Sequence, residues 1–187
     1  MRKFRRMPDR WFWLVFLIPV VSLISITIQP LLAYMSGEQI TLKTVPVDPK
    51  DLFYGDYVRL KLAIEEVDIS QLDSTLARKV TNHPSDSGIP VYVSLKHGRG
   101  TYEVDQVSES RPSNALYLKG TLQSKSAFPF GEKKKYRMDY QLDRYYVEEG
   151  SGKKWEALSQ KGGVLVDVKV KNGCGVIIGI KENSDKY

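Results

Sequence analysis

The sequence has few of the residues that form metal sites or disulfide bonds. Cys174 is the only cysteine in 187 residues, so the chain forms no internal disulfide. The two histidines, His83 and His97, lie in separate polar segments without a zinc-ligand spacing. We therefore predict no metal ion and no cofactor. Cys174 is interpreted as a small buried residue, with intermolecular pairing or a reactive thiol as alternatives.

Charged residues are absent from Trp11–Ile28. Eighteen helical residues rise about 27 Å, and extension to Tyr34 completes a hydrocarbon core of about 30 Å. Trp11, Trp13 and Tyr34 stand at the two ends of this segment, as interfacial aromatic residues do. We predict a transmembrane helix over residues 11–34.

Basic residues precede the apolar segment and predict its orientation. They are Arg2, Lys3, Arg5, Arg6 and Arg10. The positive-inside rule makes residues 1–10 a cytoplasmic tail and residues 35–187 an exported domain. A cleaved signal peptide is the alternative, but the apolar segment is long for that role and shows no clear cleavage site. An uncleaved signal-anchor in the cell membrane is favoured.

A broad basic surface is also missing. The net charge is +6, and residues 1–34 carry five basic residues against Asp9, which leaves +2 for the remainder. A near-neutral domain lacks the positive footprint of a phosphate-backbone binder. We predict that the protein does not bind nucleic acid.

The exported part has the two-residue periodicity of β-strands. Strands are predicted at residues 39–45, 57–64, 90–95, 101–107, 115–122, 136–147, 164–170 and 174–180. Residues 68–80 repeat apolar residues at helical spacing, with Asp68 or Ser70 as the N-cap. Asn172-Gly173 predicts a type I′ hairpin turn. The predicted fold is mostly β: one N-terminal transmembrane helix, then an antiparallel β-domain with one short helix.

The turn before residue 57 is unusually rich in conformationally restricted residues. Pro49 fixes φ, Asp48 and Asp56 accept backbone hydrogen bonds, and Gly55 takes conformations closed to other residues. These residues shape a tight turn that leads into a strand. A calcium cage that includes Asp51 is the alternative, but the residue order of an EF-hand is missing.

Gly55-Asp56-Tyr57, preceded by Val47–Leu52, resembles the signature of the GDYXXXLXY family of small membrane-anchored bacterial proteins. There are two departures from that pattern. Leu62 replaces the closing aromatic residue, and Leu60 falls one residue earlier than the signature states.

A second segment, Asp143–Gly150, also resembles this family. Family members have an aromatic pair that leads into a valine-proline-glutamate-glycine turn, and Glu148 replaces the proline here. The resemblance implies an accessory or partner-binding subunit of a larger membrane protein.

A type I signal peptidase has a similar layout, but it needs a serine nucleophile just before this turn. No serine lies between Gln39 and Tyr57, and Val47 stands where the serine is expected. Ser151-Gly152-Lys153-Lys154 spells S-x-x-K, which we interpret as a solvated glycine turn rather than a helix start. We predict that the protein is not an enzyme; a cell-envelope hydrolase or signal-peptidase-like protease is the alternative.

Tyrosines interleaved with basic residues suggest a binding strip. They are Tyr136, Tyr140, Tyr145 and Tyr146, with Lys135, Arg137 and Arg144. Such a strip can stack on sugars or bind a protein; the alternative is a sheet with half of these tyrosines packed inward.

We therefore predict a single-pass, membrane-anchored, extracytoplasmic binding or accessory protein, with a membrane protein as its partner. The candidate binding residues are Asp48, Pro49, Gly55, Asp56, Tyr57, Tyr146, Glu149 and Gly150.

The orientation can be tested on intact cells. A membrane-impermeant lysine or cysteine reagent is expected to label residues 35–187 without cell lysis, because these residues lie outside. Labelling that requires lysis would show that the predicted orientation is wrong.

Overall fold

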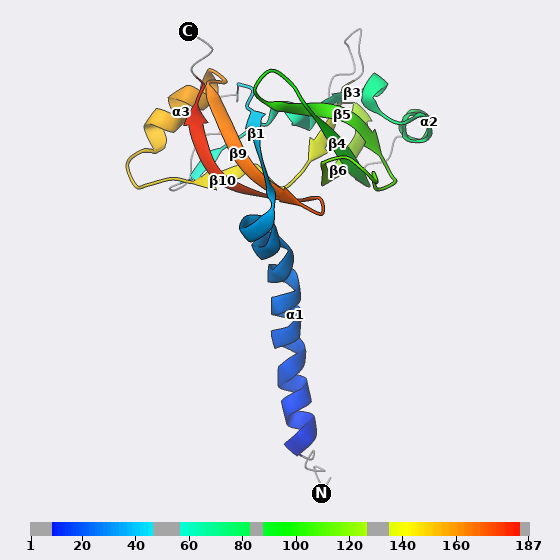
Figure 1. The fold of residues 1–187 in the computed structure, drawn as a ribbon, viewed down its shortest axis with the longest axis vertical. Coiled ribbons are helices and arrows are strands. Elements are labelled where there is room, and N and C mark those ends of the chain that lie inside the picture. The colour runs from blue at the N-terminus through cyan, green and yellow to red at the C-terminus, as the bar shows by residue number, and fades with distance from the viewer. Residues whose placement is uncertain (1–8, 47–56, 83–87, 127–134, 184–187) are drawn as a thin grey trace, which may run out of the picture.

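The computed structural model describes residues 9–46, 57–82, 88–126 and 135–183. A long helix, α1 (Asp9–Ser36), projects from a β-domain (Figure 1). The helix begins and ends two residues beyond the predicted segment. Its stretch Val15–Ser36 has a mean hydropathy of 2.2, and its most apolar window is not buried by the rest of the protein. This helix is long and apolar enough to cross a membrane.

Among the described residues, the strands form antiparallel sheets, which confirms the predicted fold class. The first sheet has the order β1 (Glu38–Lys43), β9 (Val164–Lys171), β10 (Cys174–Glu182). The second pairs β2 (Tyr57–Arg59) with β8 (Arg144–Tyr146). The third has the order β3 (Glu66–Asp68), β7 (Lys135–Asp139), β6 (Tyr117–Ser126), β4 (Ile89–His97), β5 (Tyr102–Ser108).

One hydrophobic core lies between these sheets. Alternate residues of β9 are fully buried in it: Val164, Val166, Val168 and Val170. Leu60 and Leu62, which follow β2, point into the same core. The predicted inward face of the 57–64 segment is therefore confirmed in burial, although only its first three residues form a strand.

Two predicted strands are broken in the structure. The 57–64 segment ends as β2 at Arg59 and continues through a 3₁₀ turn, η2 (Ala63–Glu65), into β3. The 136–147 segment is interrupted at Gln141, which has a φ of 57°, and the Asp139 carboxylate accepts the Gln141 N–H at 2.9 Å. Each of these two segments has the pattern of one strand, but because of its break the chain there contributes strands to two different sheets.

The predicted short helix starts later than expected. A 3₁₀ turn, η3 (Ile69–Gln71), precedes α2 (Ser74–Asn82). The Asp73 carboxylate accepts the Thr75 N–H at 2.9 Å, and its carbonyl accepts the Ala77 N–H at 2.8 Å. Asp73 is thus the N-cap of α2. Asp68, one of the two predicted N-caps, is the N-cap residue of the preceding 3₁₀ turn η3, and the prediction of Ser70 is wrong.

A further short helix, α3 (Gly152–Gln160), occupies the segment that was expected to be a glycine turn. Ser151 is its N-cap residue, so the S-x-x-K string does lie at a helix start. The Ser151 hydroxyl donates to the Glu148 carbonyl at 2.7 Å, and the Lys154 amine lies 5.7 Å from the centre of the Trp155 ring. The side chains of Ser151 and Lys154 therefore contact different neighbouring residues.

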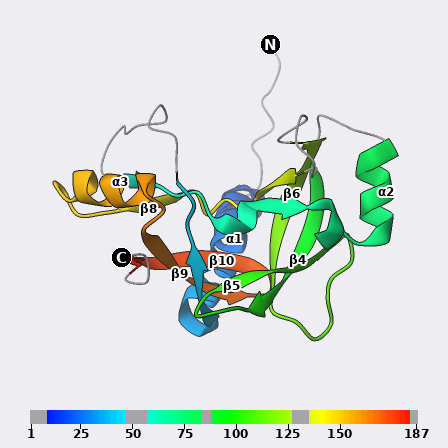
Figure 2. The same ribbon diagram turned by 90° about the horizontal axis from the view of Figure 1, so that it is seen from above.

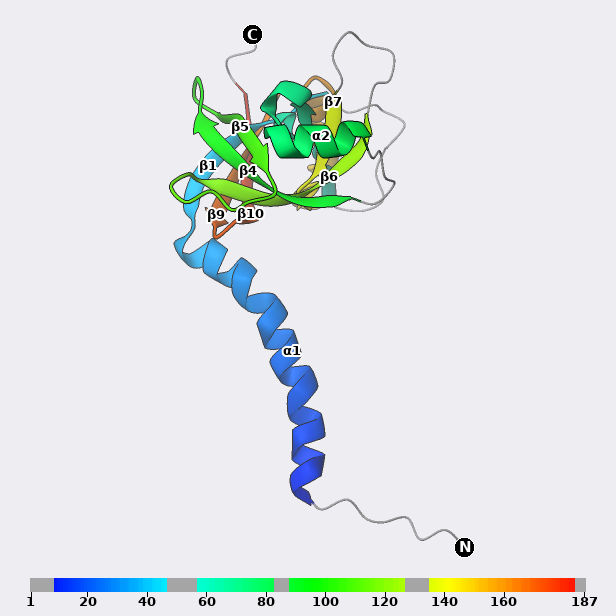
Figure 3. The same ribbon diagram turned by 90° about the vertical axis from the view of Figure 1, so that its right-hand side faces the viewer.

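The Asn172-Gly173 turn is confirmed. Lys171 pairs with Cys174, and the φ angles of Asn172 and Gly173 are 51° and 81°, as a type I′ turn requires. This β9–β10 hairpin contacts the last turns of α1 and thereby joins the helix to the β-domain (Figure 3).

Two glycines of β10 provide a matched test of the packing. A Cβ at Gly175 would lie 3.0 Å from Leu118 Cδ2 and 3.1 Å from Leu142 Cδ1, whereas one at Gly179 would meet nothing within 4 Å. We expect Gly175→Ala to lower the free energy of unfolding by about 1–3 kcal/mol, because the core must shift to accept the methyl group. Gly179→Ala is expected to change it by less than about 0.5 kcal/mol. Denaturant unfolding of the full chain in detergent measures both values, and equal values would contradict this packing.

Candidate functional site

The two sequence segments that resemble the family lie side by side in the structure. β2 and β8 pair in antiparallel register, with Tyr57 opposite Tyr146 and Arg59 opposite Arg144. Figure 2 shows β8 next to α3, at one end of the β-domain. Residues almost ninety positions apart in the chain therefore form one surface.

Side chains alternate between the faces of a strand, so Tyr57, Arg59, Arg144 and Tyr146 share the outer face of this ribbon. We call these four residues the tyrosine–arginine face. Val58 on the opposite face is buried in the core.

The tyrosine–arginine face is held together by its own contacts. The rings of Tyr57 and Tyr146 meet edge to face at 6.0 Å and 61°. The Arg144 guanidinium carbon lies 5.7 Å from the centre of the Tyr57 ring, and its Nε lies 3.3 Å from an Asp143 carboxylate oxygen. A cation above an aromatic face is attracted by the ring quadrupole.

Tyr146 is unusually exposed for a large apolar residue. Its side chain is 74% exposed, and the other large hydrophobic residues exposed to this degree among those described lie on α1. Exposure of α1 is what a membrane helix requires, whereas Tyr146 presents its ring at the surface of the β-domain.

Positive charge is concentrated beside this ring. Arg59 and Arg144 are both exposed and directly opposite one another in the register. Like charges at such positions repel. Asp143 offsets part of the charge of Arg144.

The ribbon is fixed to the core by backbone contacts. The Leu60 N–H donates to the Asp143 carbonyl at 2.8 Å, which locks the end of β2 against the start of β8. On the other side, the hydroxyl of Ser159, a buried residue of α3, donates to the Arg59 carbonyl at 3.4 Å. The missed helix α3 thus supports the tyrosine–arginine face.

The structure unites only some of the predicted site residues. Tyr57 and Tyr146 meet. Glu149 and Gly150 lie in the turn that follows β8, where Gly150 has a φ of 83°. Asp48, Pro49, Gly55 and Asp56 lie outside the described residues.

The predicted tyrosine strip is not a continuous surface. Tyr136 and Tyr140 are buried, and Tyr145 packs against the core, which leaves Tyr146 exposed. The alternative, with half of the tyrosines packed inward, is the arrangement found. The Tyr140 hydroxyl donates to the Ile64 carbonyl at 2.9 Å, and burial raises the pKa of this phenol far above its ordinary range.

Two adjacent carboxyl groups near this region have opposite electrostatic environments. Burial raises the pKa of Glu65, and its hydrogen bond from the Leu62 N–H at 2.8 Å offsets this only in part. A hydrogen bond from the Lys61 amine, at 2.8 Å, holds the pKa of Glu66 below its ordinary value. Sequence reasoning missed Glu65, because nothing in its local pattern reveals that β1, β5 and β7 pack around the 3₁₀ turn that contains it.

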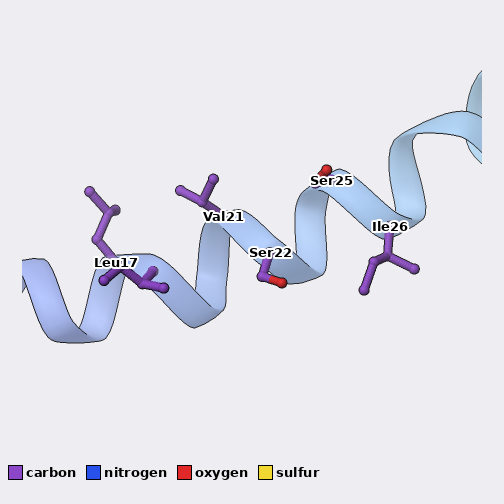
Figure 4. Close-up of a pocket in the computed structure, with 6 residues that line it drawn as sticks. Leu17, Val21, Ser22, Ser25 and Ile26 are labelled. Carbon is purple, nitrogen blue, oxygen red and sulfur yellow. The ribbon is translucent and has the colours of Figure 1, made fainter.

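The hollows of the described residues include one on α1 and one beside it. One lies on the surface of α1, where small Ser22 and Ser25 stand among larger apolar side chains such as Leu17, Val21 and Ile26 (Figure 4). The other, of about 370 Å³, lies between α1 and the β-domain, and Cys174 lines it. Burial raises the pKa of the Cys174 thiol, while Lys119 nearby opposes that shift.

No group of three or more histidine, cysteine, aspartate or glutamate side chains gathers in the described part of the chain in a way that could hold a metal ion. The arrangement on β2 and β8 offers aromatic faces and guanidinium groups, which suit recognition.

Comparison with models of protein families matches residues 19–180 to the family described as GDYXXLXY protein. The chain belongs to this family. No curated protein and no solved structure matches the chain.

The family signature places two residues, not three, between its tyrosine and its leucine. Leu60 therefore stands at the signature position, and the expected one-residue displacement is wrong. Leu62, at the position of the closing tyrosine, is fully buried and bridges to Thr44. That departure is a change within the core and leaves the tyrosine–arginine face intact.

The two glutamates make a paired prediction about pH. Relative to wild type, Glu65→Gln should gain stability as pH rises through the raised pKa of Glu65, because wild type must then bury a charge. Glu66→Gln should lose stability at neutral pH and recover relative to wild type as pH falls through the lowered pKa of Glu66. Denaturant unfolding of the three chains between pH 3 and 8 measures these differences. Parallel profiles for the two variants would contradict the assigned environments.

Proposed function

We propose that this chain is a single-pass, membrane-anchored, extracytoplasmic accessory subunit that binds a membrane-protein partner through its tyrosine–arginine face. The observation that carries this proposal is the pairing of β2 with β8, which joins the signature tyrosine to the exposed Tyr146.

The composition of the face supports binding to a protein. Tyrosine and arginine are enriched among the residues that dominate protein–protein affinity. Tyrosine buries a large area while fixing only two side-chain torsions. Tyr57 and Arg144 are already ordered by contact with one another. An ordered surface loses less conformational freedom when a partner binds.

The charge of the face indicates the chemistry of the partner. Arg59 and Arg144 lie opposite one another at the exposed surface. A carboxylate of the partner that reaches this face can form charge-assisted hydrogen bonds with a guanidinium group. We infer an acidic contact surface on the partner, next to an apolar position that receives Tyr146.

The position of the domain supports a partner in the same membrane. Gly37 alone separates α1 from β1, and its N–H donates to the Ala33 carbonyl at 2.9 Å. A connection this short holds the β-domain close to the point where α1 ends. The tyrosine–arginine face is thereby kept near the membrane surface, within reach of the exposed loops of another membrane protein.

Site-specific photocrosslinking in cells tests this proposal. A benzophenone amino acid in place of Tyr146 is expected to give one dominant crosslinked membrane protein. The same amino acid in place of Tyr102 on β5 is the control and should give no such product. Adding Arg144→Glu to the Tyr146 probe should reduce the crosslink about fivefold or more, since loss of a central arginine contact typically costs more than 1 kcal/mol.

Equal crosslinking from both positions, or no effect of Arg144→Glu, would contradict the proposed face. Purified protein that cleaves peptide or glycan, and loses this activity through one substitution in its site, would instead support the envelope hydrolase. The thermal unfolding midpoint of Arg144→Glu should stay close to that of wild type, because Arg144 is exposed.

A further inference from the structure

The groove between α1 and the β-domain has a defined composition. Gln29 and Pro30 of α1 form one wall. The start of β6, the chain after β7 and the β9–β10 turn form the rest, and its polar side chains include Lys119, Asp139 and Gln141. The Lys119 N–H donates to the Gly173 carbonyl at 2.8 Å, which fixes β6 on the turn.

Lys119 is placed to reach into this groove. Its Cγ lies over Gly173, where an added Cβ would come within 2.7 Å of it. Its ammonium group is near enough to the Cys174 thiol to influence it electrostatically. Lys119 is exposed, so the charge remains accessible from the open side.

Two further lysines line the last turn of α1. The Lys169 amine donates to the Tyr34 carbonyl at 2.8 Å and lies 5.3 Å from the centre of the Tyr34 ring. The Lys171 amine donates to the Ser36 hydroxyl. An ammonium group has three donors, so each lysine retains capacity for an anion.

These contacts define the depth of α1 in a membrane. Lys119 and Asp139 lie beside Gln29 and Pro30, and such groups are excluded from hydrocarbon. The hydrocarbon core therefore ends near Ile28. The segment Trp11–Ile28 then spans about 27 Å, close to the thickness of a bilayer core. The groove and the three lysines fall at the level of the lipid phosphates.

We propose that this groove binds the phosphate headgroup of an anionic phospholipid in the leaflet next to the β-domain. Lys119 is the principal ligand, and Lys169 and Lys171 extend the positive surface around α1. The Asp139 carboxylate accepts the Gln141 N–H at 2.9 Å, keeps its charge and opposes an anion, so the headgroup is held on the Lys119 side of the groove. The inference depends on the proposed insertion of α1 and is independent of the tyrosine–arginine face.

Native mass spectrometry of the full chain tests the proposal. The protein is released from nanodiscs that contain phosphatidylcholine and phosphatidylglycerol, and retained phosphatidylglycerol is counted. Wild type is expected to retain this lipid over phosphatidylcholine. Lys119→Gln should weaken retention about fivefold, since one lysine at a membrane surface contributes about 1 kcal/mol. Lys119→Glu should weaken it further.

Lys43→Gln is the matched control, because Lys43 is an exposed lysine at the end of β1 away from α1. It should retain the lipid as wild type does. Equal loss in both variants would overturn the proposal in favour of non-specific attraction. Displacement of the lipid by millimolar inorganic phosphate would also overturn it, because the site would then bind a free anion.

Cys174 allows a second measurement on the unaltered chain. It is the only cysteine, and it lines the groove. A bound headgroup should slow its alkylation by a maleimide at least threefold in phosphatidylglycerol nanodiscs compared with phosphatidylcholine nanodiscs. In Lys119→Gln, alkylation should be equally fast in the two kinds of nanodisc. Equal rates in wild type would overturn the proposal. Recovery of wild type and Lys119→Gln in the nanodisc fraction checks α1 insertion separately.

Discussion

The packing of β9 is the constraint on which the rest of this structure depends. Its four valines point into the core, and its backbone pairs with β1 on one side and β10 on the other. The outward residues Lys169 and Lys171 bind the end of α1. One strand therefore uses its two faces for different purposes, and a domain that lost β9 would lose both its core and its attachment to the helix.

The same alternation explains the family signature. Tyr57 points outward, whereas Val58, Leu60 and Leu62 are buried. Leu60 and Leu62 of the signature thus belong to the core, where a leucine replaces an aromatic residue without exposing a polar atom. Tyr57 belongs to the outer face of the ribbon, where it lies opposite Tyr146 of β8. This division explains why the signature identifies the family but does not indicate a chemical reaction.

Sequence patterns predicted most of this fold because many of its strands have one buried face. The two strands and the turn of the β9–β10 hairpin were predicted from alternating valines and the Asn-Gly turn, whereas the register shift between Ile177 and Gly179 was not. The tyrosine-rich segment was wrongly predicted as one strand, because the break at Gln141 depends on a local hydrogen bond that its N–H donates to Asp139 rather than on periodicity. Helix α3 was missed because Gly150 and Gly152 at its start favour a turn locally. Packing against β2 and β9 stabilises the helix instead.

The candidate site was less predictable from the sequence than the fold. Tyr57 and Tyr146 were each singled out, but their contact depends on a pairing between distant segments that no local pattern encodes. Arg59 drew no attention for the same reason, since its relevance comes from lying opposite Arg144. Once the register is known, the burial of Tyr136 and Tyr140 and the exposure of Tyr146 follow from one principle, the alternation of side chains.

The connection between α1 and the β-domain gives these surfaces a common geometry. Gly37 is packed so closely between Ala33 and Val170 that a larger residue there would displace the backbone. The domain therefore cannot swing freely on its helix. Figure 2 places β8 and α3 to one side of α1 and β4 and β6 to the other. A partner protein on the first side and lipid beneath the second would each contact a surface that is held at a fixed distance from the membrane. A rigid tether of this kind lowers the entropy lost on binding within a membrane plane, and it gives little advantage for capturing a ligand far from the membrane.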